Sequence, residues 1–488
     1  MTEVAGIGML VAVALLLIGT GLPAWMVLLG VALAFAAGGV AVGVFGLPLL
    51  TAMPARLLGL LEQDILQALP LYVLMGALLN QLPLARALFR TGRHALSGTG
   101  AGPALSGLGL GVLLAPMNGS VGASVAMLAR TVSPPLRAAG VAQMRAAALV
   151  CVASTMGVLV PPSLVLILLG DAMMRAHTEA TNLTHEAVRI INTQDVFIGA
   201  LVPAFMLLAL CAGVAWWANR GRAAPARESP PDLREWLTAV VTTLFVAGLL
   251  VGVTLGYLYA VEAAAFGAVA LFVYGLASRA LTTTVLAAVL RDTMAVTGAL
   301  VALLVAATMF TLVVRAFGTD RWAAAALAHA GLGEWGSLMV VLGIVAACAL
   351  VLDAFEMIFV VIPIALPPLL TVVHDATWVA VLTLLILQTS FLAPPFGYAV
   401  LMVRHSLRRE GALPGLARAL MPYVAAQLLV LALVLAWPAL VWQRNAAALS
   451  SDNATSTPAG GVSEDESRRM LERQLAPPDE DTGKDAKE

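Results

Sequence analysis

Charge is the scarcest property of this sequence. Only 11% of the 488 residues are charged, against about a quarter in an average soluble domain, and lysine occurs only at Lys484 and Lys487. With a net charge of -1, the chain lacks the basic field that nucleic-acid binding requires. Hydrophobic residues make up 60% and form long runs, so we predict an all-α polytopic protein that spans the lipid bilayer many times.

Cysteine is also rare, and catalytic groupings are missing. Cys151, Cys211 and Cys348 lie inside apolar runs without metal-ligand or redox spacing, which indicates small buried side chains. An intramembrane enzyme would need a nucleophile with a base, or paired carboxylates, at one depth. The six histidines fall at or near predicted loops, and Asp353 has no embedded Asp partner. These absences argue against an enzyme and predict no cofactor.

The long apolar runs predict about ten transmembrane helices, at about 20 residues per crossing. The first run lacks a basic n-region, so it is interpreted as a span rather than a signal peptide. The predicted spans are 5–22, 24–46, 58–80, 144–170, 196–218, 237–256, 258–278, 292–315, 378–403 and 419–442.

Two further apolar stretches, 101–134 and 336–371, are too long for one crossing. Small or polar residues interrupt their middles, as PMNGSVGAS and LDAFE. Irregular backbone at membrane depth survives only inside protein or beside a watery cavity. Each stretch is therefore predicted to form a re-entrant helical hairpin whose tip faces a site.

The arginines predict an orientation. If the loop 86–93 is cytoplasmic, alternation places the arginine-rich loops 220–234, 279–291 and 404–418 on the same side, as the positive-inside bias expects. Both termini are then predicted to be periplasmic. Five arginines fall outside against this bias: Arg56, Arg175, Arg189, Arg315 and Arg321.

Double prolines recur in apolar context with a fixed spacing. Pro134-Pro135 and Pro161-Pro162 are 27 residues apart, as are Pro367-Pro368 and Pro394-Pro395, and the two sets are 233 residues apart. STMGVLVPPSLVL thereby aligns with TSFLAPPFGYAVL. One half of the chain repeats the other, and the five intervening crossings invert the second copy.

An inverted repeat with broken helices is typical of secondary transporters, whose site lies where the breaks meet near the midplane. A double proline removes two N–H donors and leaves helix ends pointing inward. Unwound carbonyls can then coordinate a cation, and helix N-termini can hold an anionic group. The two breaks thus predict a transport site.

Four segments carry a family resemblance: GASVAMLARTVSPPLRAAG, STMGVLVPPSLVLILLGD, LDAFEMIFVVIPIALPP and LQTSFLAPPFGYAVLMVR. They resemble the large membrane subunit (DctM-type) of tripartite ATP-independent periplasmic (TRAP) transporters, in the mannitol/chloroaromatic-type branch, over nearly all the chain to about residue 443. The resemblance implies an elevator mechanism in the bacterial inner membrane and import of an organic acid driven by sodium. It also implies two partners, a small membrane subunit and a periplasmic solute-binding protein.

The repeat and the resemblance together divide the chain into scaffold and transport parts. The tail is polar and acidic, and is predicted to be disordered. The predicted parts are 1–100, scaffold helices and connecting arm; 101–170, first hairpin and broken helix; 171–335, scaffold helices and loops; 336–403, second hairpin and broken helix; 404–447, final scaffold helix; and 448–488, the tail.

The resemblance places binding residues at the hairpin tips and helix breaks, whose oxygens suit a hard cation. In the first half these are Asn118, Gly119, Ser120, Gly122 and Ser124 at the tip, and Ser154, Thr155, Gly157, Pro161 and Pro162 at the break. In the second half they are Asp353 and Glu356 at the tip, and Gln388, Thr389, Ser390, Pro394 and Pro395 at the break. Sodium is expected near Ser120, Ser154, Thr155, Asp353, Thr389 and Ser390.

Each of these residues also has a structural interpretation. Serine and threonine in membrane helices often bond their own backbone, prolines kink helices, and Glu356 has the alternative of facing outer water. Asp353 stands out, because a carboxylate inside the bilayer costs about 2.5 to 3.5 kcal/mol on insertion scales. The breaks contain no Lys or Arg, so a substrate carboxylate needs helix ends, hydroxyls or a loop arginine such as Arg130 or Arg315.

Two other functions stay open beside the TRAP interpretation. One is a channel or a stand-alone ion-coupled carrier of related hairpin architecture that needs no binding protein. The other is the intramembrane enzyme, against which the missing catalytic groupings argue. Repeat architecture alone does not separate the carrier from a TRAP permease.

Overall fold

The fold is taken from a computed structural model that describes residues 3–46, 51, 53–62, 64–118, 120–184, 191–221, 230–394, 397–407 and 412–441. By contacts the chain separates into a unit at Met1–Trp442 and a second at Gln443–Glu488. The tail predicted to be disordered, 448–488, lies outside the described residues, as do Gly119 and Pro395.

The predicted all-α membrane fold is confirmed, because every regular element in the described ranges is a helix. Six helices are long and apolar enough to cross a bilayer, and two bent pairs raise the number to eight. The six are α2 (Ala24–Ala41), α12 (Thr193–Asn219), α13 (Leu233–Thr254), α14 (Ala260–Ala277), α15 (Thr283–Ala316) and α22 (Ala412–Ala436). The bent pairs are α5 (Asp64–Gln81) with α6 (Leu84–Ala95), at 62°, and α10 (Gln143–Leu159) with α11 (Leu164–Thr184), at 41°.

The remaining elements are shorter. The expected spans 5–22 and 378–403 coincide with α1 (Glu3–Thr20) and with α20 (Ala376–Leu392) followed by α21 (Tyr398–Leu407). Outside the hairpins, short elements also occur as α4 (Met53–Leu61), α16 (Thr319–His329) and a 3₁₀ turn at Pro438–Leu440.

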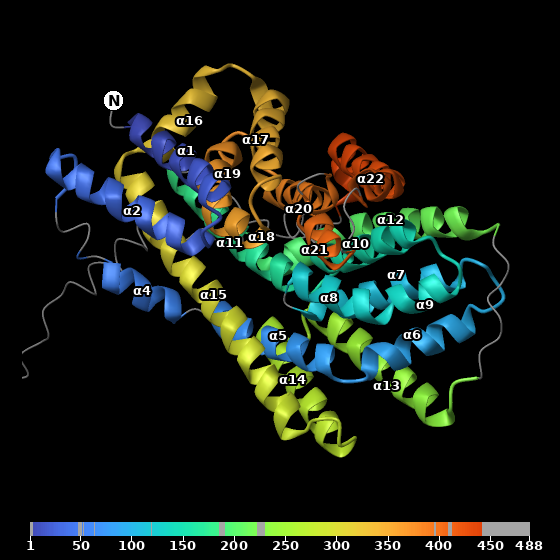
Figure 1. The fold of residues 1–488 in the computed structure, drawn as a ribbon. Coiled ribbons are helices and arrows are strands. Elements are labelled where there is room, and N and C mark those ends of the chain that lie inside the picture. The colour runs from blue at the N-terminus through green and yellow to red at the C-terminus, as the bar shows by residue number, and fades with distance from the viewer. Residues whose placement is uncertain are drawn as a thin grey trace, which may run out of the picture. The chain divides into compact units, whose positions relative to one another are not determined.

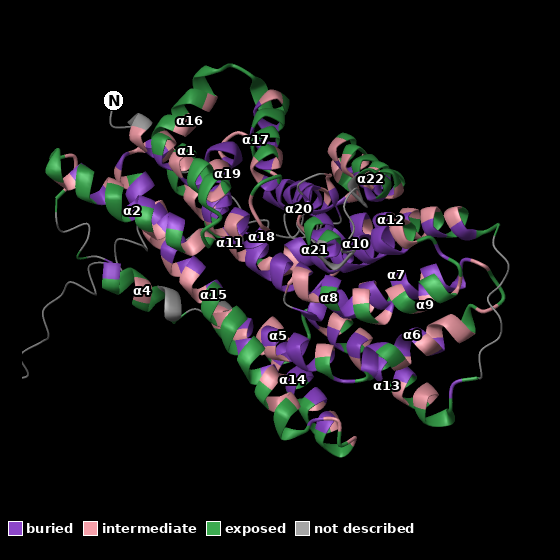
Figure 2. Cartoon of the chain, viewed as in Figure 1, coloured by how far each residue is buried: buried purple, intermediate pink, exposed green. Residues whose placement is uncertain are grey.

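The outer helices present apolar side chains to their surroundings, as a bilayer requires. Leu237 on α13, Phe266 on α14 and Met294 on α15 are each about 60% exposed. Figure 2 shows that such exposed positions run along these three helices. Packing inside the protein instead relies on the opposite faces, which bury residues such as Leu249 and Leu271.

Both predicted re-entrant hairpins are present. Hairpin 1 (102–138) consists of α7 (Gly102–Leu114), a 3₁₀ tip turn (Ala115–Asn118), α8 (Val121–Thr131) and α9 (Ser133–Ala138). Hairpin 2 (333–370) consists of α17 (Gly333–Ala349) and a return arm, made of α18 (Ala354–Glu356), a π-helical segment (Met357–Val361) and α19 (Ile362–Leu370). The arms of both hairpins have at most 17 residues, fewer than a single crossing needs.

The double prolines interrupt both broken helices where the sequence indicated. The residues between Leu159 of α10 and Leu164 of α11 include Pro161 and Pro162. Likewise, α20 ends at Leu392 before Pro394, and α21 begins at Tyr398. In the hairpins the prolines behave differently, because Pro134-Pro135 begin α9 whereas Pro367-Pro368 lie inside α19.

The hairpins of the two halves make corresponding contacts with the broken helices, as expected of an inverted repeat. The first arm of each hairpin packs on its own broken helix, α7 on α10 and α17 on α20. The returning helix also reaches the other half: α8 packs on α21 as well as on α10, and α19 packs on α11. The helices α10 and α20 also contact each other and are buried along most of their length (Figures 1 and 2). We call the two hairpins with α10, α11, α20 and α21 the repeat core.

The predicted spans 144–170 and 196–218 leave 171–195 between them as an outer loop, and this interpretation is wrong over its first half. Helix α11 continues to Thr184, although residues 185–190 lie outside the described residues. An i,i+4 ion pair between Asp171 and Arg175 supports this extension. His177 consequently lies inside a helix and is 3% exposed, rather than near a loop. Of the three cysteines, Cys151 and Cys211 are buried as predicted, and Cys348 is half-buried.

Candidate functional site

The tip of hairpin 1 holds a small network of buried polar groups. Asn118 Nδ2 donates to Ser124 Oγ at 3.1 Å, and Ser124 Oγ donates to the Ser120 carbonyl at 3.2 Å. Ser120 Oγ accepts from the Ala123 N–H at 3.1 Å and thereby caps α8. Asn118 Oδ1 is buried and has no hydrogen-bond partner among the described residues. The tip therefore offers an unsatisfied oxygen.

Glycines let two helices approach this tip closely. A Cβ on Gly157 of α10 would stand 2.4 Å from the Ala115 carbonyl carbon. A Cβ on Gly76 of α5 would stand 2.8 Å from the Asn118 backbone. Because both neighbours are backbone atoms, neither contact can relax by a rotamer change. The tip turn is thus clamped between α10 and α5.

This close approach gives a first testable prediction. We expect Gly157→Ala to displace the tip turn, to destabilise the protein by about 1 to 3 kcal/mol and to reduce transport. Gly109→Ala on α7 is the matched control, because no atom outside its own helix lies within 4 Å of the added Cβ. Thermal unfolding and uptake would be measured for both variants. Equal behaviour of the two variants would contradict a clamped tip.

The hydroxyls at the breaks bond to their own helices. Ser154 and Thr155 donate to the carbonyls of Cys151 and Val152 at 2.8 and 3.0 Å. Thr389 and Ser390 donate to the carbonyls of Leu385 and Leu387, both at 2.7 Å. A hydroxyl that donates in this way keeps its lone pairs, so the same oxygens remain able to coordinate a cation.

Gln388 links the two broken helices. It is fully buried, and its Nε2 lies 4.0 Å from Met156 Sδ on α10. Its Oε1 has no partner among the described residues, like Asn118 Oδ1 in the other half. A buried acceptor left unpaired costs about 1 to 3 kcal/mol. Oxygens of this kind fit a hard cation, which accepts hydroxyl, amide and carbonyl ligands together.

The tip of hairpin 2 is acidic and half-buried. Asp353 and Glu356 form a capping box at the start of α18, in which the Asp353 N–H donates to Glu356 Oε2 at 3.2 Å. Glu356 therefore turns back onto the tip. The π-helical segment follows directly, and such segments are frequent at functional sites.

Tyr398, the first residue of α21, is a candidate that the sequence analysis missed. Its hydroxyl oxygen would lie 3.0 Å from a Cβ on Gly122 of α8, and its ring packs edge-on against Phe391 at 6.4 Å. Tyr398 thus associates the tip of hairpin 1 with the second break. The available signal was its place directly after the sequence PPFG.

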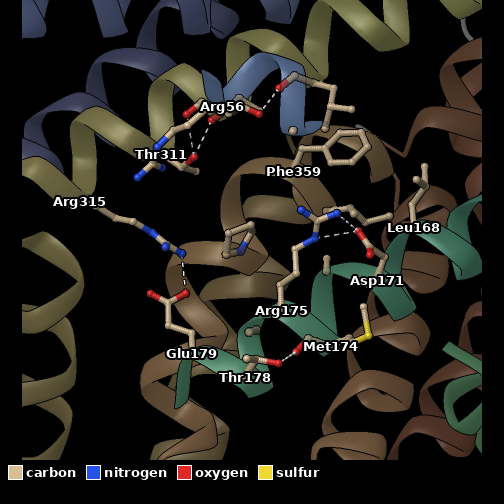
Figure 3. A pocket seen from close by; sticks show the side chains of 18 of the residues that line it. Arg56, Leu168, Asp171, Met174, Arg175, Thr178, Glu179, Thr311, Arg315 and Phe359 are labelled. Atoms are coloured by element: carbon tan, nitrogen blue, oxygen red, sulfur yellow. Dashed lines mark hydrogen bonds and ion pairs between the residues drawn. The ribbon is translucent and has the colours of Figure 1, made fainter. Parts of the chain in front are cut away.

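A pocket of about 810 Å³ opens between the repeat core and the helices α4, α5 and α15 (Figure 3). Its walls come from α4, α5, α11, α15 and the return arm of hairpin 2. Among the residues that the structure describes, none of the tip and break residues predicted from the sequence lines it. The lining combines Leu66, Leu168, Met174, Leu304, Ile358 and Phe359 with the charged residues Arg56, Asp171, Arg175, Glu179 and Arg315.

The charged residues of the pocket form two ion pairs. Arg175 bonds Asp171 Oδ2 at 2.6 Å within α11. Arg315 of α15 bonds Glu179 Oε2 of α11 at 2.5 Å, and so links α15 to the repeat core. Arg56 adds a third cation, so cations outnumber carboxylates in the lining. Of the two loop arginines considered for a substrate carboxylate, Arg315 lines the pocket, whereas Arg130 is exposed on α8 and donates to the Ala126 carbonyl at 3.1 Å.

Solved structures with a similar fold are transporters. The YdaH transporter of Alcanivorax borkumensis matches with a TM-score of 0.60 and 16% identity, over 81% of this chain and 89% of that chain. MtrF of Neisseria gonorrhoeae, described as illuminating a class of antimetabolite efflux pumps, matches with a TM-score of 0.51 and 14% identity, over 80% and 83%. At these identities the likeness concerns the fold alone.

Sequence comparison is more specific. The C4-dicarboxylate TRAP transporter large permease protein DctM of Pseudomonas aeruginosa is 26% identical over 69% of this chain and 76% of that protein. The protein of the same name from Rhodobacter capsulatus is 22% identical over 78% of this chain and 86% of its own length. The family model for the tripartite ATP-independent periplasmic transporter, DctM component, matches residues 9–440. The chain therefore belongs to the DctM family of TRAP transporters, and is a multi-pass permease component of the inner membrane rather than an enzyme.

Proposed function

We propose that this permease imports a small organic acid together with sodium ions, and that a periplasmic binding protein delivers the acid. The observation that carries this proposal is the arginine-containing pocket at the boundary of the repeat core with α4, α5 and α15. Its wall includes the π-helical segment that follows the acidic tip of hairpin 2. A pocket of about 810 Å³ lies in the range of small-molecule sites. C4-dicarboxylates are the first substrates to test, because the two DctM relatives are named for them.

Arg315 is the proposed anchor for the substrate carboxylate. A guanidinium binds a carboxylate with two parallel hydrogen bonds, which gives both strength and orientation. Arg315 is 38% exposed in its side chain and lines the pocket, so a solute in the pocket can reach it. The apolar residues of the same lining, including Phe359 of the π-helical segment, would contact the carbon skeleton of the acid.

Sodium is proposed to bind at the tips and breaks. Two observations support this assignment: the buried oxygens Asn118 Oδ1 and Gln388 Oε1 have no partner among the described residues, and Asp353 supplies a carboxylate beside the second tip. Asp353 has a defined structural position, because it caps α18 at the tip of hairpin 2. Hydroxyls at Ser154, Thr155, Thr389 and Ser390 can complete such a coordination shell.

The transport movement is proposed to be a displacement of the repeat core against the scaffold, as in an elevator. The repeat core is internally well packed, with α10 and α20 buried at its centre. The pocket lies at its boundary with α15, where a rigid-body shift would change the side from which the pocket is open. The small membrane subunit is the proposed partner of the scaffold in the bilayer.

Reconstituted uptake tests this proposal. The full chain, purified with its small subunit, would be placed in vesicles, and uptake of labelled succinate, with benzoate as a comparison, would be measured. Four conditions combine an inward sodium gradient, or none, with the periplasmic binding protein, or none. We expect uptake only when both are supplied. Uptake that ignores both contradicts the proposal, and uptake that needs sodium alone indicates a stand-alone carrier.

A further inference from the structure

The Arg315–Glu179 ion pair joins two parts of the molecule that the proposed function moves apart. Arg315 lies in the last turn of α15, and Glu179 lies on α11, the outer part of the first broken helix. Arg315 Nη2 and Glu179 Oε2 are 2.5 Å apart. The other ion pair of the pocket, Arg175 with Asp171, lies within α11, so this pair does not link two helices.

The Arg315–Glu179 pair lies in the wall of the pocket, where a solute can reach it. Figure 3 shows Arg315 and Glu179 pointing toward each other along one side of the pocket. Their side chains are 38% and 23% exposed, so the pair is open to a solute. An exposed or half-exposed pair of this kind contributes little to stability. A small competing interaction is therefore enough to replace it.

Glu179 carries the same chemical group, a carboxylate, as the proposed substrate. Its carboxylate is the same group that an organic acid would offer to Arg315, and it already accepts from Nη2 of the guanidinium. An arriving carboxylate must either displace Glu179 or remain beside it, where the two negative charges repel. Displacement relieves this repulsion and lets the anion take two parallel donors of the guanidinium.

We propose that Glu179 is an internal stand-in for the substrate carboxylate, which holds Arg315 while the pocket is empty and gives it up when the anion binds. The exchange also removes the ion pair between α11 and α15, so that occupancy of the pocket loosens the repeat core from the scaffold. The identity of the anion as an organic acid rests on the proposed function, whereas the shielding of Arg315 by Glu179 does not.

A purely structural ion pair predicts the opposite response to mutation. If Glu179 served only to hold α11 against α15, Glu179→Gln would weaken the assembly and leave anion affinity unchanged or poorer. If Glu179 competes with the substrate, the same variant binds the anion more tightly. Glutamine preserves the size of the side chain, so the variant removes charge with little change in packing.

The experiment measures first whether Glu179 covers Arg315, without any substrate. The full chain with its small subunit, in proteoliposomes, would be treated with phenylglyoxal, and modification of each arginine would be followed by mass spectrometry. We expect Glu179→Gln to raise the labelling rate of Arg315 several-fold. Asp171→Asn is the control within the pocket, because it removes the Asp171–Arg175 ion pair and should leave the labelling of Arg315 unchanged. An unchanged Arg315 rate in Glu179→Gln overturns the proposal.

The second measurement is affinity in uptake. We expect Glu179→Gln to lower the KM for succinate about three- to tenfold, as removal of a weak competing ion pair predicts. Glu235→Gln is the matched control, because Glu235 pairs with Arg90 at 2.8 Å between two helices outside the pocket, and its KM should stay unchanged. An equal or higher KM in Glu179→Gln overturns the competition. If the wild type takes up no organic acid, the proposed function fails, and the labelling result still decides the role of Glu179.

Discussion

Replacing Arg315 by glutamine is expected to raise the KM for the transported acid about 10- to 100-fold. The reason is the loss of a charged, bidentate contact, which costs about 1.4 to 2.8 kcal/mol at this range of affinities. Lysine should recover part of the loss, because it restores the charge without the fork geometry. Initial rates of uptake at graded concentrations of succinate would measure the KM of each variant.

Arg130→Gln provides the comparison for Arg315. Arg130 was the other arginine available to a substrate carboxylate, but it is exposed on α8 and does not line the pocket. Its replacement should leave the KM within about twofold of the wild type, since surface substitutions usually change free energies by about 0.5 kcal/mol or less. A larger effect at Arg130 than at Arg315 would place the anion at hairpin 1 and remove it from the pocket.

The second large effect is expected at Asp353. Asp353→Asn should raise the sodium concentration for half-maximal uptake at least about tenfold, because a carboxylate in a low-dielectric site contributes more than about 1.4 kcal/mol to cation binding. Asparagine caps helices as well as aspartate does, so α18 should keep its start. The measurement is a sodium activation curve in vesicles, together with the yield of assembled protein.

Asp232→Asn separates the loss of a capping charge from the loss of an ion ligand. Asp232 also begins a helix with a capping box, at the start of α13, but it is exposed and belongs to neither hairpin. It should leave the sodium dependence unchanged. Sodium dependence that is also unchanged in Asp353→Asn would remove Asp353 from the ion site.

Local sequence patterns predicted most of the helices. Apolar runs of about 20 residues mark spans because every backbone polar group must be satisfied within the segment. The tip signals PMNGSVGAS and LDAFE, and the repeated double prolines, likewise act through the backbone around them. These features depend on a few neighbouring residues, so they can be recognised without knowledge of the tertiary contacts.

The charged pocket was not predicted, because it depends on contacts between residues that are far apart in the sequence. Arg56 and Arg175 appeared only as exceptions to the charge bias, and Arg315 was considered for a substrate carboxylate only as one of two loop arginines. The interval 171–195 between two predicted spans was interpreted as a loop. Their common location depends on α11 continuing to Thr184 and packing near α15 and hairpin 2. Tyr398 was missed for a similar reason, because its significance lies in its approach to Gly122, far away in the chain.

The amino-acid sequence by itself determined that this protein is a multi-pass helical transporter component with two hairpins and two broken helices in inverted halves. Only the tertiary structure decided which oxygens at the tips stay unpaired, and that Arg315 meets Glu179 across a pocket. The difference is physical: lipid selects the composition of each segment separately, whereas a site between helices depends on side chains that approach one another only after packing.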